Sequence, residues 1–281
     1  MKKIFQAILL SSVMVFAACS EEESNFDNGA AVRTFNLDGA KFNMIKVEGG
    51  TFLMGAQSTD PSAANYDPSA RENEGPVHSV TLSTFYIAEF ETTCNIVRKA
   101  GISAGMGRES DMPIRNIYRK DVLQFVEKLN EIMHANGQLA KNEKFALPTE
   151  AQWEYAARGG KYSHNYIYSG SNDYNKVAYC QENSDMYSFT KVGSFDPNEL
   201  GLYDMSGNCF EMCIDDWGMY SEESQVDPQG PATVTDSKSY VMKGGSFYVS
   251  KTLCRVTYRG QVNDDTEANS FSVRLALVNV K

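Results

Sequence analysis

The sequence predicts an α+β domain with few helices, short strands and much irregular backbone, and three patterns predict it. Two stretches space their apolar residues by three and four positions, as an amphipathic helix does. Short runs of alternating apolar and polar residues around these stretches predict strands. The connecting segments are rich in Ser, Asn, Asp, Tyr and Gly, which predicts long loops.

The first residues predict a leader rather than part of the fold. Two lysines after Met1 are followed by the apolar run Ile4–Ala18 and then by Cys19. This order is typical of a secretory signal peptide, here 1–18, and the apolar run is too short for a membrane span. The cysteine at the cleavage point, with Phe16 at position −3, resembles a bacterial lipobox. The resemblance implies that Cys19 becomes a lipidated N-terminus and anchors the chain to a membrane.

The segment after the leader is polar and shows little periodicity. Residues 19–40 are therefore predicted to be the lipidated N-terminus and a flexible tether. Ser20–Glu23 resembles the acidic export signal of surface lipoproteins, which implies an outer membrane lipoprotein. A solvated tether and a secreted protein cut nearby are the alternatives, and exposure on the cell surface is left open. Residues 41–281 contain no second linker and predict one domain.

Strand and loop patterns begin the predicted domain. Met44–Val47 and Thr51–Met54 flank Glu48-Gly49-Gly50, which predicts a β-hairpin. Ala56–Gly75 predicts a long loop, and Val77–Ile87 predicts the next strand.

Two helices follow. Apolar residues at helical spacing predict an amphipathic helix over Lys120–Met133. Leu147–Gly160 predicts a second helix, in which Thr149 is the N-cap and Gln152 completes a capping box. The last predicted strands are Ser239–Lys243, Leu253–Arg259 and Ser270–Val278.

Composition excludes some classes of function. The chain has 26 basic and 36 acidic residues among 281, for a net charge of −10. Such a chain repels phosphate backbones, so we expect no binding of nucleic acid. The three histidines are far apart and no CxxC occurs, which disfavours a zinc or iron site.

The stretch Gly201–Trp217 combines glycines, carboxylates and large apolar residues. Asp204 and Glu211 bracket Gly207, and a hard cation such as calcium would fit their oxygen atoms. A tight turn before a buried strand is the alternative.

Several stretches match one family in order. They are Val47–Gly55, Glu74–Val80, Leu147–Gly160, Gly201–Trp217 and Lys243–Phe247. Together they resemble the formylglycine-generating enzyme (sulfatase-modifying factor) domain. This resemblance implies a variant of the C-type lectin fold. It also implies a structural calcium ion held by the side chains of Asp204 and Glu211 and the carbonyls of Gly207 and Cys209.

The catalytic pattern of that family is broken in this chain. The enzymes use a pair of cysteines that binds copper(I), a metal that favours thiolates. Here Val249 stands at the first cysteine and Cys254 falls at the second, so copper is not expected. Cys254 is predicted to be a core thiol or the disulfide partner of Cys213 or Cys209. The full pairing among Cys94, Cys180, Cys209, Cys213 and Cys254 is left open, and an odd number leaves one unpaired.

These features favour a lipid-anchored envelope protein that is not an enzyme and that binds a protein or glycan ligand. Predicted ligand-binding residues are Phe247, Tyr248 and Lys251. Gly244–Leu277 also resembles the variable region of diversity-generating retroelement proteins. A sulfatase-maturing oxidase that converts cysteine to formylglycine is one alternative, and a structural lipoprotein of an envelope or secretion assembly is another.

Overall fold

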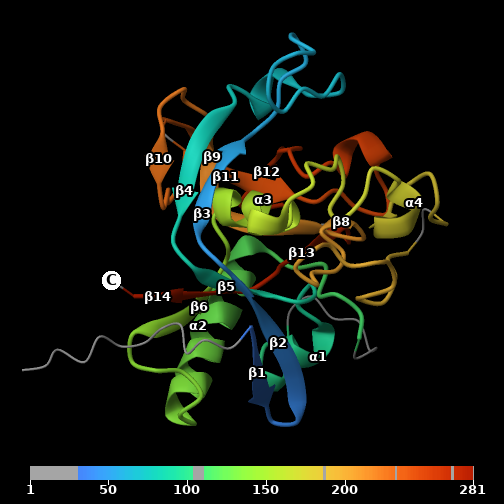
Figure 1. Cartoon of the computed structure of the whole chain (residues 1–281). Coiled ribbons are helices and arrows are strands. Elements are labelled where there is room, and N and C mark those ends of the chain that lie inside the picture. The colour runs from blue at the N-terminus through green and yellow to red at the C-terminus, as the bar shows by residue number, and fades with distance from the viewer. Residues whose placement is uncertain (1–30, 104–110, 186–187, 232, 267–268, 281) are drawn as a thin grey trace, which may run out of the picture.

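The computed structural model describes residues 31–103, 111–185, 188–231, 233–266 and 269–280 (Figure 1). The predicted signal peptide and Cys19 lie outside these residues. Within the described ranges, no helix is long and apolar enough to cross a membrane.

One half of the domain is built on a five-stranded antiparallel sheet in the order β1-β2-β5-β14-β6. Its strands are β1 (Val32–Leu37), β2 (Ala40–Val47), β5 (Phe85–Ala88), β14 (Ala276–Asn279) and β6 (Glu143–Ala146). The sheet therefore joins the start of the described chain to its end. The helices α1 (Cys94–Lys99) and α2 (Arg119–Ala135) pack against it.

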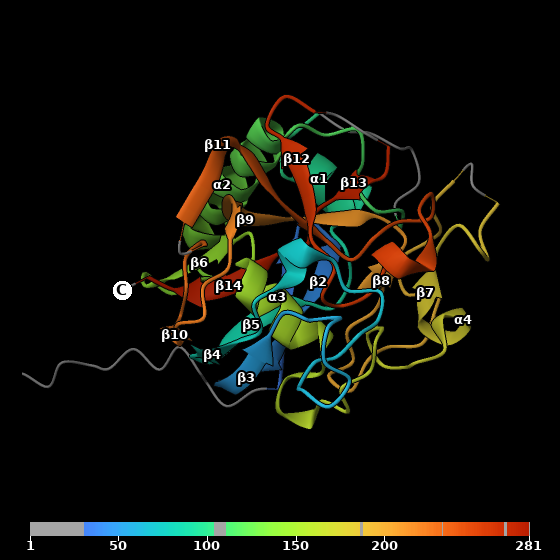
Figure 2. The ribbon, with the colours of Figure 1, turned by 90° about the horizontal axis from the view of Figure 1, so that it is seen from above.

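The other half contains three smaller sheets. They are β10-β4-β3, β12-β11-β9-β13 and the pair β7-β8. Their strands are β3 (Gly50–Met54), β4 (His78–Leu82), β7 (Ala178–Tyr179), β8 (Ser206–Gly207), β9 (Phe210–Met219), β10 (Gln225–Val226), β11 (Thr233–Lys243), β12 (Gly260–Asn263) and β13 (Phe271–Ser272). The helices here are α3 (Glu150–Ala157) and α4 (Tyr174–Val177), with single 3-10 turns at Glu72–Glu74, Gly160–Tyr162 and Lys251–Leu253. Figure 2 shows α4 and β7 at the opposite side of this half from β10.

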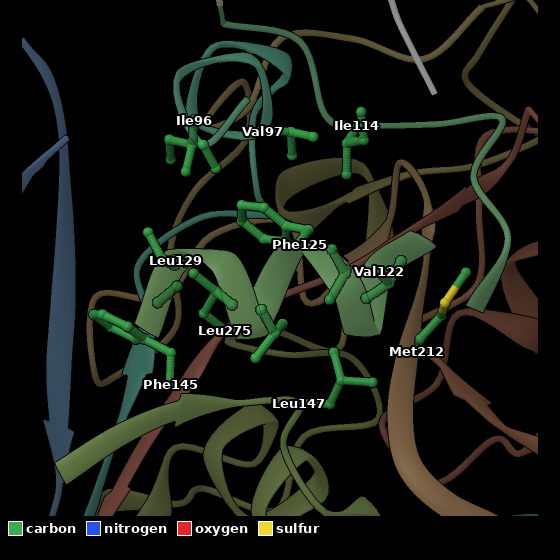
Figure 3. Close-up of a cluster of buried hydrophobic side chains, with 14 of the residues drawn as sticks. Ile96, Val97, Ile114, Val122, Phe125, Leu129, Phe145, Leu147, Met212 and Leu275 are labelled. Carbon is green, nitrogen blue, oxygen red and sulfur yellow. The ribbon is translucent and has the colours of Figure 1, made fainter. Parts of the chain in front are cut away.

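Both predicted helices are confirmed. The apolar face of α2 buries Val122, Phe125 and Leu129 in the larger core (Figure 3). In α3, the Thr149 hydroxyl accepts from the Gln152 amide at 3.1 Å, and the Gln152 side chain accepts from the Thr149 amide at 3.0 Å. This capping box was predicted from the sequence, and it supplies partners for two donors at the helix start.

The predicted tether ends earlier than residue 40. Residues 32–37 form β1, which pairs with β2 and buries Phe35 and Leu37. The domain therefore includes Val32–Leu37, and the predicted start at residue 41 is wrong. The sequence did not reveal this strand because the polar residues around the two buried side chains resemble those of the tether.

The hairpin predicted around Gly49-Gly50 is wrong, because β2 and β3 belong to different sheets. A Cβ atom on Gly49 would lie 2.5 Å from the Leu82 carbonyl oxygen, and one on Gly50 would lie 2.6 Å from the Tyr155 hydroxyl. Both glycines are therefore needed where the chain passes from one sheet to the other. The strand predicted over 77–87 is divided at the same place, since Thr84 lies between β4 and β5 and its hydroxyl accepts from the Gly49 amide at 3.1 Å.

Two of the predicted C-terminal strands also differ. The segment 253–259 is not a strand but an irregular run whose residues from 254 onward are buried. The strand predicted over 270–278 is divided into β13 and β14 by residues 273–275. In both segments, arginine side chains enter the core and bind carboxylates, and strand pairing gives way to these contacts.

Candidate functional site

The stretch 201–217 is centred on a buried ion pair between Glu211 on β9 and Arg274 after β13. Both side chains are fully buried. The Arg274 Nη2 donates to Glu211 Oε1 at 2.6 Å, and its Nε donates to Oε2 at 2.9 Å. The indole Nε1 of Trp153 also donates to Glu211 Oε2, at 2.6 Å. The remaining donors of Arg274 bind the carbonyls of three residues from other segments, Ala88, Glu89 and Tyr203.

Two further buried carboxylates surround this pair. Glu91 accepts from the Asn208 side chain at 2.5 Å and from the Cys209 amide at 3.0 Å. Asp204 accepts from the Gly193 amide at 2.6 Å. Burial raises the pKa of Glu91 well above its usual value and the pKa of Asp204 to about 6. The sequence did not predict a role for Glu91, because its contacts with Asn208 and Cys209 exist only in the folded chain.

The predicted calcium ligands Asp204, Gly207, Cys209 and Glu211 all lie in this region, and the donor set fits calcium only in part. Arg274 donates to both carboxylate oxygens of Glu211, and Trp153 donates to one of them. A cation bound there would therefore share the carboxylate with a guanidinium group. In the described part of the chain, no group of three or more His, Cys, Asp or Glu side chains is arranged to hold a metal ion. The calcium site stays a prediction that depends on carbonyl ligands.

Three more cations from the C-terminal segment are buried in ion pairs. The closest contacts are Lys243–Glu154 at 3.2 Å, Arg255–Glu74 at 2.5 Å and Arg259–Glu150 at 2.5 Å. Desolvation is the largest influence on the pKa of Arg255 and Arg259, but the paired carboxylates outweigh it and raise both values. These residues hold the segment 243–259 against α3 and against the 3-10 turn Glu72–Glu74.

The two positions predicted to correspond to the family's cysteine pair, Val249 and Cys254, lie within this segment. Val249 packs against an apolar cluster that contains Cys254 and Cys180. The two thiols influence each other's acidity: the neighbouring Cys254 lowers the pKa of Cys180, and the neighbouring Cys180 raises the pKa of Cys254. The predicted pairing of Cys254 with Cys213 or Cys209 is therefore wrong, since these two lie in different clusters. The alternative of a core thiol agrees with the burial of Cys254.

The three predicted ligand-binding residues have different surroundings. Phe247 is 1% exposed and packs with Phe189 and Cys209. Tyr248 is 60% exposed, and the ammonium group of Lys251 lies 4.5 Å from the centre of the Tyr174 ring. Tyr248 and Lys251 are thus available to a ligand, whereas Phe247 is part of the core.

A groove of about 730 Å³ opens on the face formed by β3, the long loop after it and the segment after α3. Its lining includes the aromatic residues Phe52, Tyr66, Tyr155 and Tyr166. Val256 and Thr257 line it as well. The rings of Phe52 and Tyr155 are in contact, with centroids 5.0 Å apart. Sequence reasoning missed this groove because its walls come from distant parts of the chain.

Comparison with known proteins now identifies the family. The model of the sulfatase-modifying factor enzyme 1-like domain matches residues 36–278. The chain belongs to this family. The predicted fold class and the predicted resemblance to formylglycine-generating enzyme are therefore confirmed.

Relatives within the sulfatase-modifying factor family differ in their names and lengths. The chaperone protein LppX of Paenibacillus barcinonensis is 26% identical, over 93% of this chain and 94% of that protein. The formylglycine-generating enzyme of Thermomonospora curvata is 27% identical, over 83% of this chain and 92% of that enzyme. The serine/threonine-protein kinase Pkn1 of Chlamydia trachomatis is 27% identical over 83% of this chain, which spans only 38% of that protein.

Solved structures share the architecture of this sulfatase-modifying factor domain. Treponema denticola variable protein 1 superimposes with a TM-score of 0.72 and 22% identity, over 88% of this chain and 99% of that chain. At this identity, the likeness concerns the fold.

We expect Arg274→Met to destabilise the protein by about 3–5 kcal/mol, because it leaves Glu211 buried without a countercharge. Urea unfolding monitored by tryptophan fluorescence measures the change in the free energy of unfolding. The control is Lys99→Met, which removes the exposed partner of Asp38 and should change little. An Arg274→Met protein as stable as the wild type would contradict the central role of this pair.

We predict that a calcium chelator lowers the melting temperature, because an ion bound only by the folded state adds stability. Asp204→Asn should reduce this shift, whereas the exposed Asp60→Asn should retain it. Differential scanning fluorimetry with and without EDTA measures both. A wild-type melting curve that does not respond to EDTA would remove the calcium site.

Proposed function

We propose that this chain is a lipid-anchored envelope protein whose sulfatase-modifying factor domain binds a ligand and catalyses no oxidation. The observation that carries the proposal is Val249 at the first position of the cysteine pair. A valine has no atom that binds copper(I), and the family's oxidation of cysteine requires two thiolates at the metal.

The surroundings of Cys254 support the loss of catalysis. Cys180 provides a second thiol, but it comes from the end of β7 rather than from the family's position. Both cysteines are 0% exposed and lie under Tyr168 and Val249. A substrate cysteine has to reach the reacting thiols, and burial prevents this approach.

The anchoring part of the proposal rests on the leader and Cys19. The relative LppX, which this chain matches over nearly its whole length, has a lipoprotein-style name, and this agrees with a lipid anchor. Lipidation at Cys19 would place the folded domain outside the membrane at the end of a short polar segment. We propose the outer membrane as the location, on the strength of the acidic residues that follow Cys19.

The groove supports ligand binding and favours a glycan. Tyr66 and Tyr166 line it and are accessible to solvent. Sugar rings pack their C–H faces on aromatic side chains, while their hydroxyls bind polar groups, and the groove offers both kinds of surface. Arg158 and Asp67 lie in its wall. A protein client is the alternative ligand, and the name of the relative LppX, a chaperone, favours it.

The resemblance of 244–277 to a variable region agrees with ligand binding in the groove. Val256 and Thr257 belong to that segment and line the groove. The solved structure reported above is itself named a variable protein. Display of changing residues on a fixed scaffold is thus a specific form of the proposed ligand-binding function.

We expect the purified protein to leave a sulfatase-derived cysteine peptide unchanged in the presence of copper and oxygen. Mass spectrometry detects the conversion of cysteine to formylglycine as a loss of sulfur and a gain of an aldehyde. The formylglycine-generating enzyme of Thermomonospora curvata serves as the positive control. Formation of the aldehyde by this chain would establish the oxidase alternative.

We expect Tyr66→Ala and Tyr166→Ala to weaken glycan binding by about tenfold each, because each removes an aromatic surface from the groove. An oligosaccharide array identifies the ligand, and titration calorimetry with that sugar measures affinity. Tyr162→Ala is the matched control, since Tyr162 is 54% exposed but does not line the groove. The glycan assignment fails if no oligosaccharide binds, or if all three variants behave alike.

A further inference from the structure

Cys180 and Cys254 are the two cysteines in the described part of the chain that share one buried cluster. Tyr168 and Val177 complete this cluster. Cys180 follows β7, and Cys254 follows the 3-10 turn Lys251–Leu253. The pair thus connects two irregular segments that no common sheet holds together.

Hydrogen bonds join the two segments that carry the pair. The Gln181 amide donates to the Val249 carbonyl at 3.0 Å. The Glu182 carboxylate accepts from the Ser250 hydroxyl and from the Lys251 amide, both at 2.8 Å. These contacts hold the two segments side by side on either side of the thiols. The two cysteines are therefore carried by segments that the folded chain already holds together.

We propose that Cys180 and Cys254 form a disulfide that fixes the segment 246–254 to the segment 180–184. The oxidant is a disulfide, either a small one such as glutathione disulfide or that of a thiol oxidoreductase. One cysteine thiolate attacks the oxidant, forms a mixed disulfide and releases one reduced thiol. The second cysteine then attacks the mixed disulfide and releases the other thiol, so that two protons and two electrons leave the pair.

The two thiols differ in acidity in the folded chain. The neighbouring Cys254 thiol lowers the pKa of the Cys180 thiol, whereas the Cys180 thiol together with burial raises the pKa of Cys254. Because both thiols are buried in the native structure, the exchange takes place while the chain folds.

This disulfide changes the meaning of Cys254, the cysteine that the family pattern places in the catalytic pair. Its sulfur would be bonded to Cys180 and withdrawn from metal binding. The link would also hold Tyr248 and Lys251 in place on the surface, since both lie in the segment it fixes. Cys94, Cys209 and Cys213 lie in three other clusters and remain thiols. In the cell the proposal rests on the envelope location, because cytoplasmic thiols would keep the pair reduced.

The test is to refold the full chain with a glutathione redox buffer and to map disulfides by mass spectrometry of non-reduced digests. We expect one linked peptide pair that joins Cys180 to Cys254. Dithiothreitol should release it only after urea is added, because the bond is buried. Recovery of both cysteines as thiols, or linkage of either to another cysteine, overturns the proposal.

Variants separate a disulfide from a simple packing contact. We expect Cys180→Ser and Cys254→Ser each to lower the melting temperature of the oxidised protein by about 10 °C. In the double variant, the missing disulfide should lower the melting temperature no further than it does in either single variant. Cys213→Ser, at a buried cysteine in another cluster, should retain the linked peptide. Equal melting temperatures for the oxidised and reduced wild type would contradict a stabilising link.

The outcome is independent of the ligand and oxidase experiments. Refolding with glutathione does not depend on membrane anchoring or on any ligand. A disulfide in a chain that binds no glycan would leave this inference intact, and free thiols in a chain that binds a glycan would overturn this inference alone.

Discussion

The ion pair of Glu211 and Arg274 is the contact on which the junction of the two halves depends. A guanidinium group has five donors in a rigid plane, and Arg274 uses them on one carboxylate and three carbonyls. Those carbonyls come from the end of β5, the residue after it and the loop before β8. Irregular backbone can be buried here because one side chain supplies the hydrogen bonds that strand pairing would otherwise provide.

The same solution recurs along the C-terminal segment. Lys243, Arg255 and Arg259 each bind a glutamate that lies 89 to 181 residues earlier in the chain. Buried ion pairs add little net stability, since the loss of hydration offsets much of the attraction. A wrong pairing, however, leaves an uncompensated charge in the interior. The four cations therefore select one arrangement for a segment that has few strands to define its path.

Features that depend on neighbouring residues could be predicted from the sequence, whereas contacts between distant segments could not. The periodicity of α2 and the cap of α3 arise within a few residues, so the sequence indicates them directly. The passage from β2 to β3 depends on contacts of Gly49 and Gly50 with Leu82 and Tyr155, which no local pattern reveals. Strand β1 was missed for a related reason, since only its pairing with β2 distinguishes it from a polar tether.

The same distinction between local and distant features applies to the candidate site. Order and spacing placed Glu211 in a family motif and Val249 at a missing cysteine. They did not reveal that Arg274 binds Glu211 or that Cys180 lies beside Cys254, because these contacts join positions 63 and 74 residues apart. The groove is a further example, since its aromatic residues come from β3, from the loop after it, from α3 and from the segment that follows.

The groove and the buried ion pairs together have a consequence for substitutions at the rim. Arg255, which directly precedes the groove residues Val256 and Thr257, pairs with the fully buried Glu74. The backbone of the wall is thus set by charges in the interior rather than by the side chains that face outward. Exchange of an outward-facing side chain at the rim would leave the ion pair of Arg255 with Glu74, which fixes this part of the wall, intact.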